Sequence, residues 1–391
     1  MELKGKENKD CKIFIEEIEP AAIKTIYNLL DSPAFKDKSI RIMPDVHEGK
    51  GIVIGFTSEL GDCVNPNHVG VDIGCGLLTE KIQCLNGLSL EEINEEILRV
   101  IPMGFNYNQN PIYKELDYSM IESHVAIFIR NWNKRYNDNK ERIVINEKYI
   151  TNLIKKVDIS SNTFYNSIGT LGGGNHFIEL GLDEEGYYWL TIHTGSRNFG
   201  LKVCEYHCNQ AKKQIGKPNE YLYGDYMFEY CVDMVIAQYY AKLNRETILL
   251  QILRNLRFTP IQQINSIHNY IDFDHFFIRK GAISALKGEL CVIPFNMRDG
   301  LLICEGKGNA DWNYSAPHGA GRISSRSQAK KNISMEDYNE SMKDVYSTCV
   351  CKETLDESPM AYKDSKLIEV LIEPTVGVLH KVKPVINIKA K

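Results

Sequence analysis

The sequence predicts an α+β fold, formed by one interwoven domain that carries a helical insertion. Short apolar runs rich in Val, Ile and aromatic residues are typical of strands, and they are interspersed with stretches of helical spacing along the 391 residues. Residues 108 to 162 are polar, rich in Asn and Lys, and helical in spacing, so we expect them to form a helical excursion from the core. No repeat, low-complexity tract or convincing linker divides the chain, so residues 1–391 are predicted to fold as one domain.

The composition is that of a soluble globular protein, and it excludes several classes. A net charge of -5 argues against non-specific coating of nucleic acid, so any polyanion would need a local basic patch. The eleven cysteines are scattered without a CxxC pair, which favours the reducing cytoplasm over a disulfide framework. The charged N-terminus has no signal-peptide core, and no apolar run approaches membrane-spanning length, so we expect a cytoplasmic protein without a membrane partner.

The N-terminal part alternates short strands with a helix. A strand is expected over residues 12–19, and a helix over residues 20–30, because Pro20 suits the first helical turn. A further strand over residues 39–43 leads into PDVHEGKG, residues 44–51, whose polar groups predict a turn. The apolar run IVIGF, residues 52–56, is then expected to be a buried strand.

The next motif, HVGVDIGCG, carries the first candidate ligands. Three glycines in this short run imply tight backbone approach and unusual dihedral angles. In such a turn Asp72 and Cys75 can point to a common centre, and a carboxylate and a thiolate so placed are plausible metal ligands. The alternative, a small buried cysteine and an aspartate that caps a turn, explains this stretch equally well.

Two histidines flank the expected hairpin at the centre of the chain. The run WLTI, residues 189–192, reads as a buried strand, with GGGNHFIE before it and HTGSR directly after it. His176 then lies at the start of one strand and His193 at the end of its partner, at the same end of one sheet. Each histidine alone would be read as a core residue, but the surrounding glycines, Asn175 and the Ser196–Arg197 pair favour a metal or phosphate site.

The remaining elements follow in the C-terminal half. A helix over residues 201–215 places Cys204 and Cys208 on one face beside His207, which one buried stripe explains better than a metal site. Further predicted elements are a capped helix from Ser89, one or two buried helices over 223–256, a strand over 264–271, β-rich segments over 276–303, a helix from Ser334 and a strand at the C-terminal end.

The two last histidine motifs lie in this half. His268 is in the middle of the strand predicted over 264–271, where a core role is the default. His318 lies in HGAGR, a glycine-rich loop before an expected helix with Arg326, Lys330 and Lys331. A helix start with flanking arginines favours phosphate binding, whereas the alternative is an ordinary turn with a solvated basic face.

Together these motifs resemble a known family. PDVHEGKG, HVGVDIGCG, LGGGNHFIEL, HTGSR, IHNY, HGAGR and AYKD, spread from residue 44 to residue 364, resemble in order and wording the RtcB family of RNA ligases. The resemblance covers essentially the whole chain and implies mixed β-sheets around a central metal site. It further implies joining of an RNA 3′-phosphate or 2′,3′-cyclic phosphate to a 5′-hydroxyl with GTP and manganese, in RNA repair or tRNA splicing. An archease-type activator is a further partner that the resemblance suggests.

The resemblance also implies roles for individual residues. His318 would carry GMP as the nucleophile. Separately from the resemblance, the positive charges in or just after the motifs predict a local basic surface that binds RNA phosphates despite the negative net charge, formed by Arg197, Arg322, Arg326, Lys330 and Lys331. The implied metal ligands are Asp72, Cys75, His176, His193 and His268, and the implied guanylate pocket is formed by Asn175, Glu179, Ala320, Gly321, Tyr362 and Lys389.

The metal preference of these ligands and the wording of two motifs differ from what is common in the RtcB family. Three imidazoles and a thiolate by themselves suit zinc, so manganese follows from the resemblance alone. Where relatives commonly have PDVHPGYG and a small PGSMG-type turn, this chain has PDVHEGKG and PFNMRD, while the six metal and guanylylation positions are intact. A metal-dependent phosphohydrolase acting on RNA ends and a non-catalytic RNA-binding protein remain the alternative functions.

Overall fold

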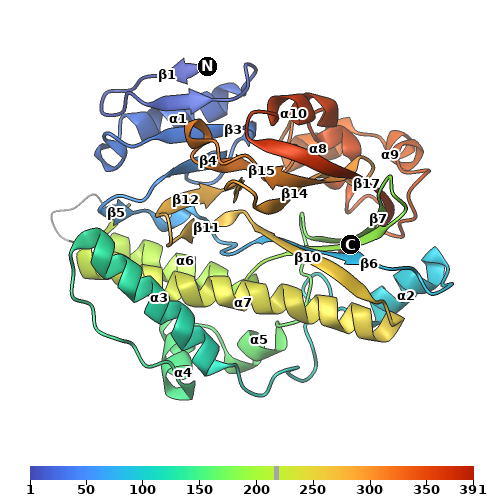
Figure 1. Cartoon of the computed structure of the whole chain (residues 1–391), viewed down its shortest axis with the longest axis horizontal. Helices are drawn as coiled ribbons and strands as arrows, with labels where there is room; N and C mark the ends of the chain where they lie inside the picture. The colour runs from blue at the N-terminus through green and yellow to red at the C-terminus, as the bar shows by residue number, and fades with distance from the viewer. Residues whose placement is uncertain (215–219) are drawn as a thin grey trace.

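The computed structural model describes residues 1–214 and 220–391, and it confirms a mixed fold of helices and several β-sheets (Figure 1). Within these residues, the strands form a six-stranded sheet in the order β1-β2-β3-β4-β12-β11, a seven-stranded sheet in the order β10-β6-β8-β7-β17-β15-β14, and the pairs β13-β16 and β5-β9. The strands are β1 Glu2–Leu3, β2 Cys11–Ile13, β3 Ile40–His47, β4 Ile54–Glu59, β5 Cys63–Val64, β6 Gly76–Ile82, β7 Phe177–Leu182, β8 Tyr188–Thr194, β9 Leu222–Tyr223, β10 Pro260–Ile267, β11 Asn269–Asp272, β12 Phe277–Lys280, β13 Ala282–Ser284, β14 Leu290–Asn296, β15 Gly300–Gly306, β16 Ser315–Pro317 and β17 Val376–Ile388.

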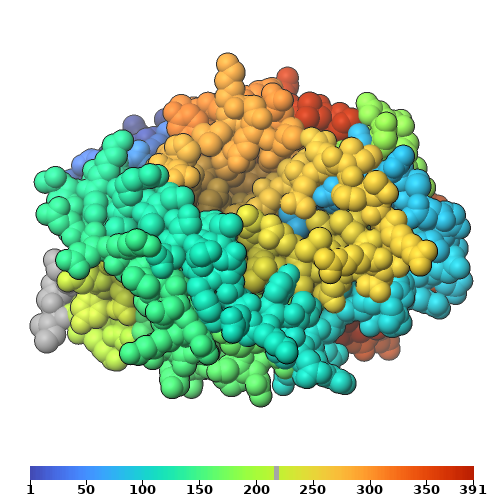
Figure 2. All heavy atoms as spheres, turned by 60° about the horizontal axis from the view of Figure 1, so that its bottom comes forward, coloured from blue at the N-terminus to red at the C-terminus, as the bar shows by residue number. Residues whose placement is uncertain are grey.

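The five consecutive helices α3 to α7 gather on one side of the sheets. In Figure 1, α3, α4, α5, α6 and α7 lie below the strands, and in Figure 2 the blue-green segment that includes α3 covers the front face beside the yellow residues of α7 and β10. The α-helices are α1 Pro20–Leu30, α2 Leu90–Val100, α3 Tyr118–Tyr136, α4 Glu147–Lys156, α5 Ser161–Asn166, α6 Arg197–Ala211, α7 Gly224–Leu256, α8 Arg326–Asn332, α9 Met335–Ser341 and α10 Ser365–Leu371. The 3-10 helices are η1 Pro33–Phe35, η2 Pro66–His68, η3 Ala310–Trp312, η4 Leu355–Glu357 and η5 Pro359–Ala361.

Elements with strong local signals agree with the prediction. Helix α1 has the predicted bounds, with Pro20 in its first turn. Helix α2 begins at a complete capping box, in which the Ser89 hydroxyl accepts from the Glu92 amide and the Glu92 carboxylate accepts from the Ser89 amide. Of the residues 223–256 predicted as one or two helices, all but residue 223 form the single helix α7, whose apolar residues are buried along most of its length. Each of these elements depends on neighbouring residues in the chain, which is why sequence spacing is informative for it.

The central hairpin is also confirmed. Strands β7 and β8 pair in antiparallel register, and Phe177 lies opposite His193. Strand β6 pairs on the other side of β8, with Gly76 opposite Thr194. All but one residue of β8 are buried, as the apolar run WLTI predicts. The pairing therefore brings Cys75, His176 and His193 to one end of the seven-stranded sheet.

Three local predictions are wrong. The strand predicted over residues 12–19 is limited to β2, which contains three residues. Residues 44–47, predicted as part of a turn, extend β3 to His47, where it pairs with Ile54 of β4 across an irregular register. Helix α6 begins at Arg197 and ends at Ala211, so it starts earlier than predicted, and residue 215 of the predicted range lies outside the described residues.

The strand predicted over residues 264–271 is two strands of different sheets. Strand β10 belongs to the seven-stranded sheet and pairs with β6, whereas β11 belongs to the six-stranded sheet and pairs with β12. His268 is the single residue between them, and its backbone amide donates to the Cys75 carbonyl at 2.9 Å. The chain therefore crosses from one large sheet to the other at His268.

Candidate functional site

The candidate ligands lie on neighbouring strand ends. Asp72 and Cys75 precede β6, His176 precedes β7, His193 is near the end of β8, and His268 separates β10 from β11. Strands β10, β6, β8 and β7 are adjacent in that order, so all five side chains meet where the two large sheets approach each other. The structure thus brings together every residue that the sequence motifs indicate as a metal ligand.

The donor atoms are close enough to share metal ions. Cys75 Sγ lies 3.3 Å from His193 Nε2 and 3.6 Å from His176 Nε2. His176 Nε2 lies 2.8 Å from Asp72 Oδ2, and His193 Nε2 lies 3.3 Å from His268 Nε2. Ligands about 2.0 to 2.3 Å from one tetrahedral ion are about 3.3 to 3.8 Å apart, so the three spacings of 3.3 to 3.6 Å suit common ligation, whereas Asp72 and His176 lie at the 2.8 Å of a hydrogen bond.

The cluster divides into two overlapping groups of three donors. Cys75, His193 and His268 form one group, and Asp72, Cys75 and His176 form the other, with the donor atoms in each group within 4.8 Å of one another. Cys75 belongs to both groups. A thiolate at this position can therefore contact one ion in each group.

Burial sets the charge of the cluster. Burial lowers the pKa of His193 and of His268 well below the ordinary value, so both imidazoles are neutral and offer a nitrogen lone pair. Burial, and next the adjacent Asp72, raise the pKa of the Cys75 thiol well above its ordinary value. Burial of Asp72 opposes its ionisation, but the adjacent His176 outweighs this and lowers the pKa of Asp72 to about 2. A divalent cation would favour the Cys75 thiolate and offset the cost of burying these groups together.

Backbone carbonyls fix the orientation of two histidines. His176 Nδ1 donates to the Leu171 carbonyl at 2.9 Å, and His193 Nδ1 donates to the Asn175 carbonyl at 3.1 Å. Each bond leaves Nε2 as the nitrogen with a free lone pair, and in both histidines Nε2 faces Cys75. This arrangement is common for imidazole ligands of metals.

Two buried residues of α7 support the cluster from behind, and the motif analysis does not identify them. The Arg245 guanidinium donates to the Gly74 carbonyl at 2.6 Å and to the Thr194 carbonyl at 2.9 Å, beside Cys75 and His193. The Asn244 amide group bonds backbone atoms of residues 169–170 and 195. Both residues are fully buried. The available sequence signal is this adjacent Asn–Arg pair within a mostly buried helix.

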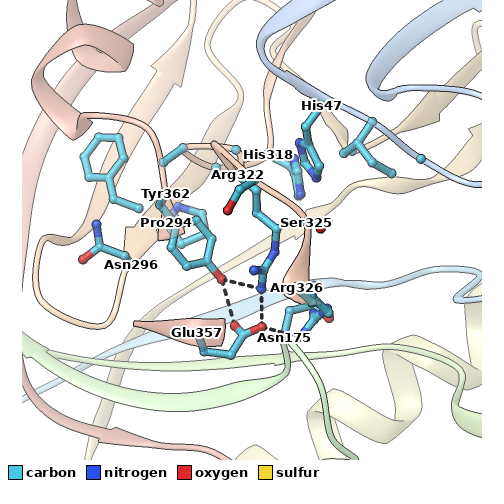
Figure 3. A pocket seen from close by; sticks show the side chains of 18 of the residues that line it. His47, Asn175, Pro294, Asn296, His318, Arg322, Ser325, Arg326, Glu357 and Tyr362 are labelled. Carbon is cyan, nitrogen blue, oxygen red and sulfur yellow. Dashed lines mark hydrogen bonds and ion pairs between the residues drawn. The ribbon is translucent and has the colours of Figure 1, made fainter. Parts of the chain in front are cut away.

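A cavity of about 1030 Å³ opens beside His193 and His268. Its lining comes from segments distant in the sequence, including the loop after β16, residues 294–297, residues 47–50 and the C-terminal strand. Figure 3 shows His318 and His47 on one side of this cavity and Glu357 with its partners on another. The residues that the resemblance assigns to guanylate all line it, and they are Asn175, Glu179, Ala320, Gly321, Tyr362 and Lys389.

His318 lies in this cavity with one ring nitrogen held. His318 Nδ1 lies 2.6 Å from Asp45 Oδ2, and the His318 ring is centred 4.8 Å from the His268 ring. Asp45 is fully buried near the end of β3. Its carboxylate accepts from Nδ1–H and leaves Nε2 as the nitrogen with the lone pair. The sequence motif PDVH contains Asp45, but the expected turn gives no reason to pair it with His318.

A buried glutamate organises the opposite wall. Glu357 Oε2 accepts from the Tyr362 hydroxyl at 2.8 Å and from Lys389 Nζ at 3.0 Å, and Oε1 accepts from Arg326 at 2.6 Å and from Arg322. Burial opposes its ionisation, but the charges of Lys389, Arg322 and Arg326 outweigh this and lower the pKa of Glu357 to about 2. Sequence reasoning does not identify this residue.

These contacts alter the basic surface predicted around α8. Arg326 Nη1 also lies 2.7 Å from Asp356 Oδ2, and Lys330 Nζ lies 3.2 Å from Asp356 Oδ1. The sequence motifs predict that these cations are free to bind RNA phosphates. In the structure, however, Arg322 pairs with Glu357, and Arg326 and Lys330 pair with Asp356. Arg197, in contrast, hydrogen-bonds the Thr170 hydroxyl at 3.2 Å and the Gly104 carbonyl at 3.4 Å, which are neutral.

Glu179 is the second buried carboxylate of the cavity. Asn387 Nδ2 donates to Glu179 Oε2 at 2.7 Å. Burial raises the pKa of Glu179 to about 8, against the lowering effect of Asn387 and Lys389. The side chain is therefore mostly protonated at neutral pH.

Together, the fold and the site define a mixed α+β protein with a buried Asp/Cys/His cluster that could hold metal ions, next to a cavity of nucleotide size that contains a further histidine. The sequence profile described as tRNA-splicing ligase RtcB matches residues 26–390. The chain belongs to the RtcB family, which confirms the resemblance seen in its motifs.

Individual relatives agree over most of the chain. It is 30% identical to an RNA-splicing ligase RtcB of Escherichia coli strain K12, over 99% of each protein. It is 24% identical to the RNA-splicing ligase RtcB2 of another Escherichia coli strain, over 95% of this chain and 93% of the relative. The tRNA-splicing ligase RtcB of Nanoarchaeum equitans is 26% identical, over 88% of this chain and 84% of the relative. Among the described residues, no helix is both long and apolar enough to cross a membrane.

Proposed function

We propose that this protein is an RNA ligase that joins RNA 3′-phosphate or 2′,3′-cyclic phosphate ends to 5′-hydroxyl ends through a histidine–GMP intermediate. Membership of the RtcB family and the ligase names of its relatives support the reaction class. The single observation that carries the mechanism is the position of His318. It lies in a nucleotide-sized cavity, has Nδ1 bonded to Asp45, and is adjacent to His268 of the donor cluster.

The first step uses His318 as the nucleophile. Its Nε2 attacks the α-phosphorus of GTP, a nitrogen–phosphorus bond forms, and pyrophosphate leaves. The Asp45 carboxylate accepts the hydrogen bond from His318 Nδ1–H throughout the step. Its negative charge therefore stabilises the positive charge that the imidazole ring acquires. Gly321 has φ +75°, and a side chain there would meet the Asp45 backbone, so glycine is required where this loop approaches β3.

The GMP then moves to RNA. An oxygen of the RNA 3′-phosphate attacks the phosphorus of the bound GMP, and the bond to His318 breaks. The RNA 5′-hydroxyl next attacks the activated 3′-phosphorus, and GMP leaves as the new phosphodiester forms. A 2′,3′-cyclic phosphate end needs one water to open the ring before it can enter this sequence.

Asp72, Cys75, His176, His193 and His268 would hold the divalent ions, for which we propose manganese on the basis of family membership. When bound, the ions supply positive charge that neutralises phosphate oxygens and aligns the attacking and leaving groups. Histidine nitrogens, a thiol and a carboxylate oxygen in this geometry fit one or two divalent ions, and the donors themselves do not select manganese.

The guanylate would occupy the cavity between His318 and Glu179. A carboxyl group at Glu179 can pair with the polar edge of guanine, and its burial makes an unmatched base costly to accommodate. Lys389 and Tyr362 are held by Glu357 at 3.0 and 2.8 Å, so the wall around the nucleotide is already organised.

Labelling with GTP tests this proposal. The protein is incubated with manganese and GTP labelled at the α-phosphate, and acid-labile label on the protein is measured together with ligation of a 2′,3′-cyclic phosphate RNA. The variant His318→Ala should lose both the label and ligation while its metal content, measured by mass spectrometry, is unchanged. The variant Cys75→Ala should lose metal and, with it, both activities.

The alternative functions give different results. A metal-dependent phosphohydrolase would release phosphate from RNA ends without protein labelling, and a non-catalytic RNA-binding protein would show neither reaction. Retention of covalent GMP by His318→Ala, or loss of metal from that variant, would contradict the assigned roles.

A further inference from the structure

A second cavity, of about 1370 Å³, lies behind the wall that bounds the nucleotide cavity. Arg326, Glu357 and Lys389 line both cavities, so they form the partition between them. The second cavity is further lined by the loop of residues 101–107, by Gly173 and Gly174, and by Arg197. The nucleotide cavity is lined by His193, His268 and His318, whereas the second cavity is lined by Gly173 and Gly174, which directly precede the segment that carries His176.

We propose that this second cavity binds the single-stranded RNA leading to the ligation site, with bases stacked on Phe105 and Tyr107. The inference rests on the proposed ligase function and names the surface that such an enzyme would use for its RNA strand. The nucleotide and the RNA then occupy different cavities that share the wall of Arg326, Glu357 and Lys389, so neither has to leave before the other can bind.

Two exposed aromatic side chains form the rim of the cavity. Phe105 is 103% exposed and Tyr107 is 53% exposed, although aromatic side chains of this size normally pack against the protein. Phe105 contributes no burial to the described core, so packing of the fold does not account for it. Aromatic rings beside a groove provide stacking surfaces for nucleic-acid bases of any sequence.

The loop of residues 101–107, which carries Phe105 and Tyr107, is hydrogen-bonded to the segment that precedes His176. The Gly104 amide donates to the Gly172 carbonyl at 2.8 Å, and the Leu171 amide donates to the Pro102 carbonyl at 2.9 Å. The Leu171 carbonyl in turn accepts from His176 Nδ1 at 2.9 Å. Three hydrogen bonds thus connect the loop that carries Phe105 to a candidate metal ligand, so a strand stacked on this loop has a defined position relative to the cluster.

Charge favours a phosphate backbone at the inner end of the cavity. Among the described residues no carboxylate lies within 4.0 Å of Arg197, although the Asp72 carboxylate is near enough to oppose the lowering of the Arg197 pKa by burial. The Arg197 guanidinium lies against Gly172, where a Cβ atom would be 1.7 Å from Nη1. Glycine at residue 172 therefore leaves the space that Arg197 occupies. Along the second cavity, Asp356 and Glu357 are already paired with Lys330 and Arg326, so their charges are partly neutralised.

The test compares RNA affinity in matched variants. The double variant Phe105→Ala/Tyr107→Ala removes both rings, Phe105→Trp keeps a stacking surface, and Tyr226→Ala removes an aromatic that is 44% exposed and lines neither cavity. The dissociation constant of a short fluorescent single-stranded oligouridylate is measured by anisotropy at low and high salt. Circular dichroism and thermal unfolding of each variant establish that it is folded.

At about 1 to 3 kcal/mol per stacked base, the double variant, which removes two rings, should bind the oligouridylate at least about 30-fold more weakly. The difference should persist at high salt, because stacking is not screened as phosphate contacts are. Phe105→Trp should bind at least as tightly as the wild type, and Tyr226→Ala should resemble the wild type. Equal affinity of the folded double variant and the wild type would overturn the inference, as would an equal loss in Tyr226→Ala.

GTP labelling of the wild-type protein separates this inference from the proposed function. If the wild type is not labelled, the ligase proposal fails whatever its RNA affinity. If it is labelled and ligates RNA, but the double variant keeps full affinity and an unchanged KM for RNA, the ligase proposal stands and only the stacking surface is wrong.

Discussion

Replacement of Glu179 by glutamine should change the pH dependence of stability in a calculable way. Glu179 is 3% exposed, and burial raises its pKa from 4.5 to about 8. The folded protein therefore retains a proton that the unfolded chain releases near pH 4.5. The stabilising effect of that proton is fully present below pH 4.5 and is lost as the pH rises toward about 8.

The magnitude follows from the difference between the two pKa values. One proton changes the free energy of unfolding by about 1.4 kcal/mol per pH unit, so an interval of about 3.5 units corresponds to about 5 kcal/mol. Between about pH 5.5 and about pH 7.5 the loss is about 3 kcal/mol. Glutamine is neutral at every pH and nearly isosteric, so Glu179→Gln should lack this contribution. Its stability relative to the wild type should increase over that interval.

Urea denaturation at several pH values measures the effect, after reversibility has been established by refolding. The difference between variant and wild type removes the contribution of groups that titrate alike in both proteins. Glu305→Gln, which alters an exposed glutamate on β15, provides the matched control and should show a nearly constant difference. A constant difference for Glu179→Gln as well would refute the raised pKa of Glu179.

Three further predictions concern the site. Asp45→Asn removes the charge that faces His318 Nδ1 at 2.6 Å, so labelling by GTP should slow roughly 10- to 100-fold while the metal content measured by mass spectrometry stays the same; loss of metal would contradict this role. Arg245→Met leaves the carbonyls of residues 74 and 194 without their buried donor, so the free energy of unfolding should fall by about 3 kcal/mol in urea titrations, and metal affinity should fall with it. An unchanged unfolding midpoint would show that water replaces the guanidinium. RNA affinity should decrease as salt increases, and Arg197→Ala should lower the slope of log K against log salt by about 0.7, the value for one phosphate of a single strand. An unchanged slope would place Arg197 away from the RNA backbone.

Local sequence patterns predict much of the candidate site. The hairpin that brings His176 and His193 together follows from a buried apolar run between two turns, and its register is now observed. The glycine-rich motifs indicated where chemistry-bearing side chains approach the backbone. The gathering of Asp72, Cys75 and His268 around these two histidines needed the whole arrangement of strands β6, β8 and β10.

Long-range partners were not predicted. Asp45 bonds His318 across 273 positions of the sequence, and Glu357 bonds Lys389 from another segment. A carboxylate in a polar motif has many candidate cations and histidines, and sequence spacing does not select among them. For the same reason Arg326 and Lys330 seemed free to bind phosphate until the structure placed Asp356 and Glu357 beside them.

The sequence by itself determined the family, the class of fold, the helices with strong caps and the identity of the residues that could carry chemistry. Tertiary structure decided which of those residues meet, where His268 crosses between the sheets, and which charges are neutralised by a partner. The physical reason is the range of the forces involved. Helix capping and strand alternation act over a few residues, whereas burial, ion pairing and donor geometry depend on atoms that only the completed fold brings within a few ångströms.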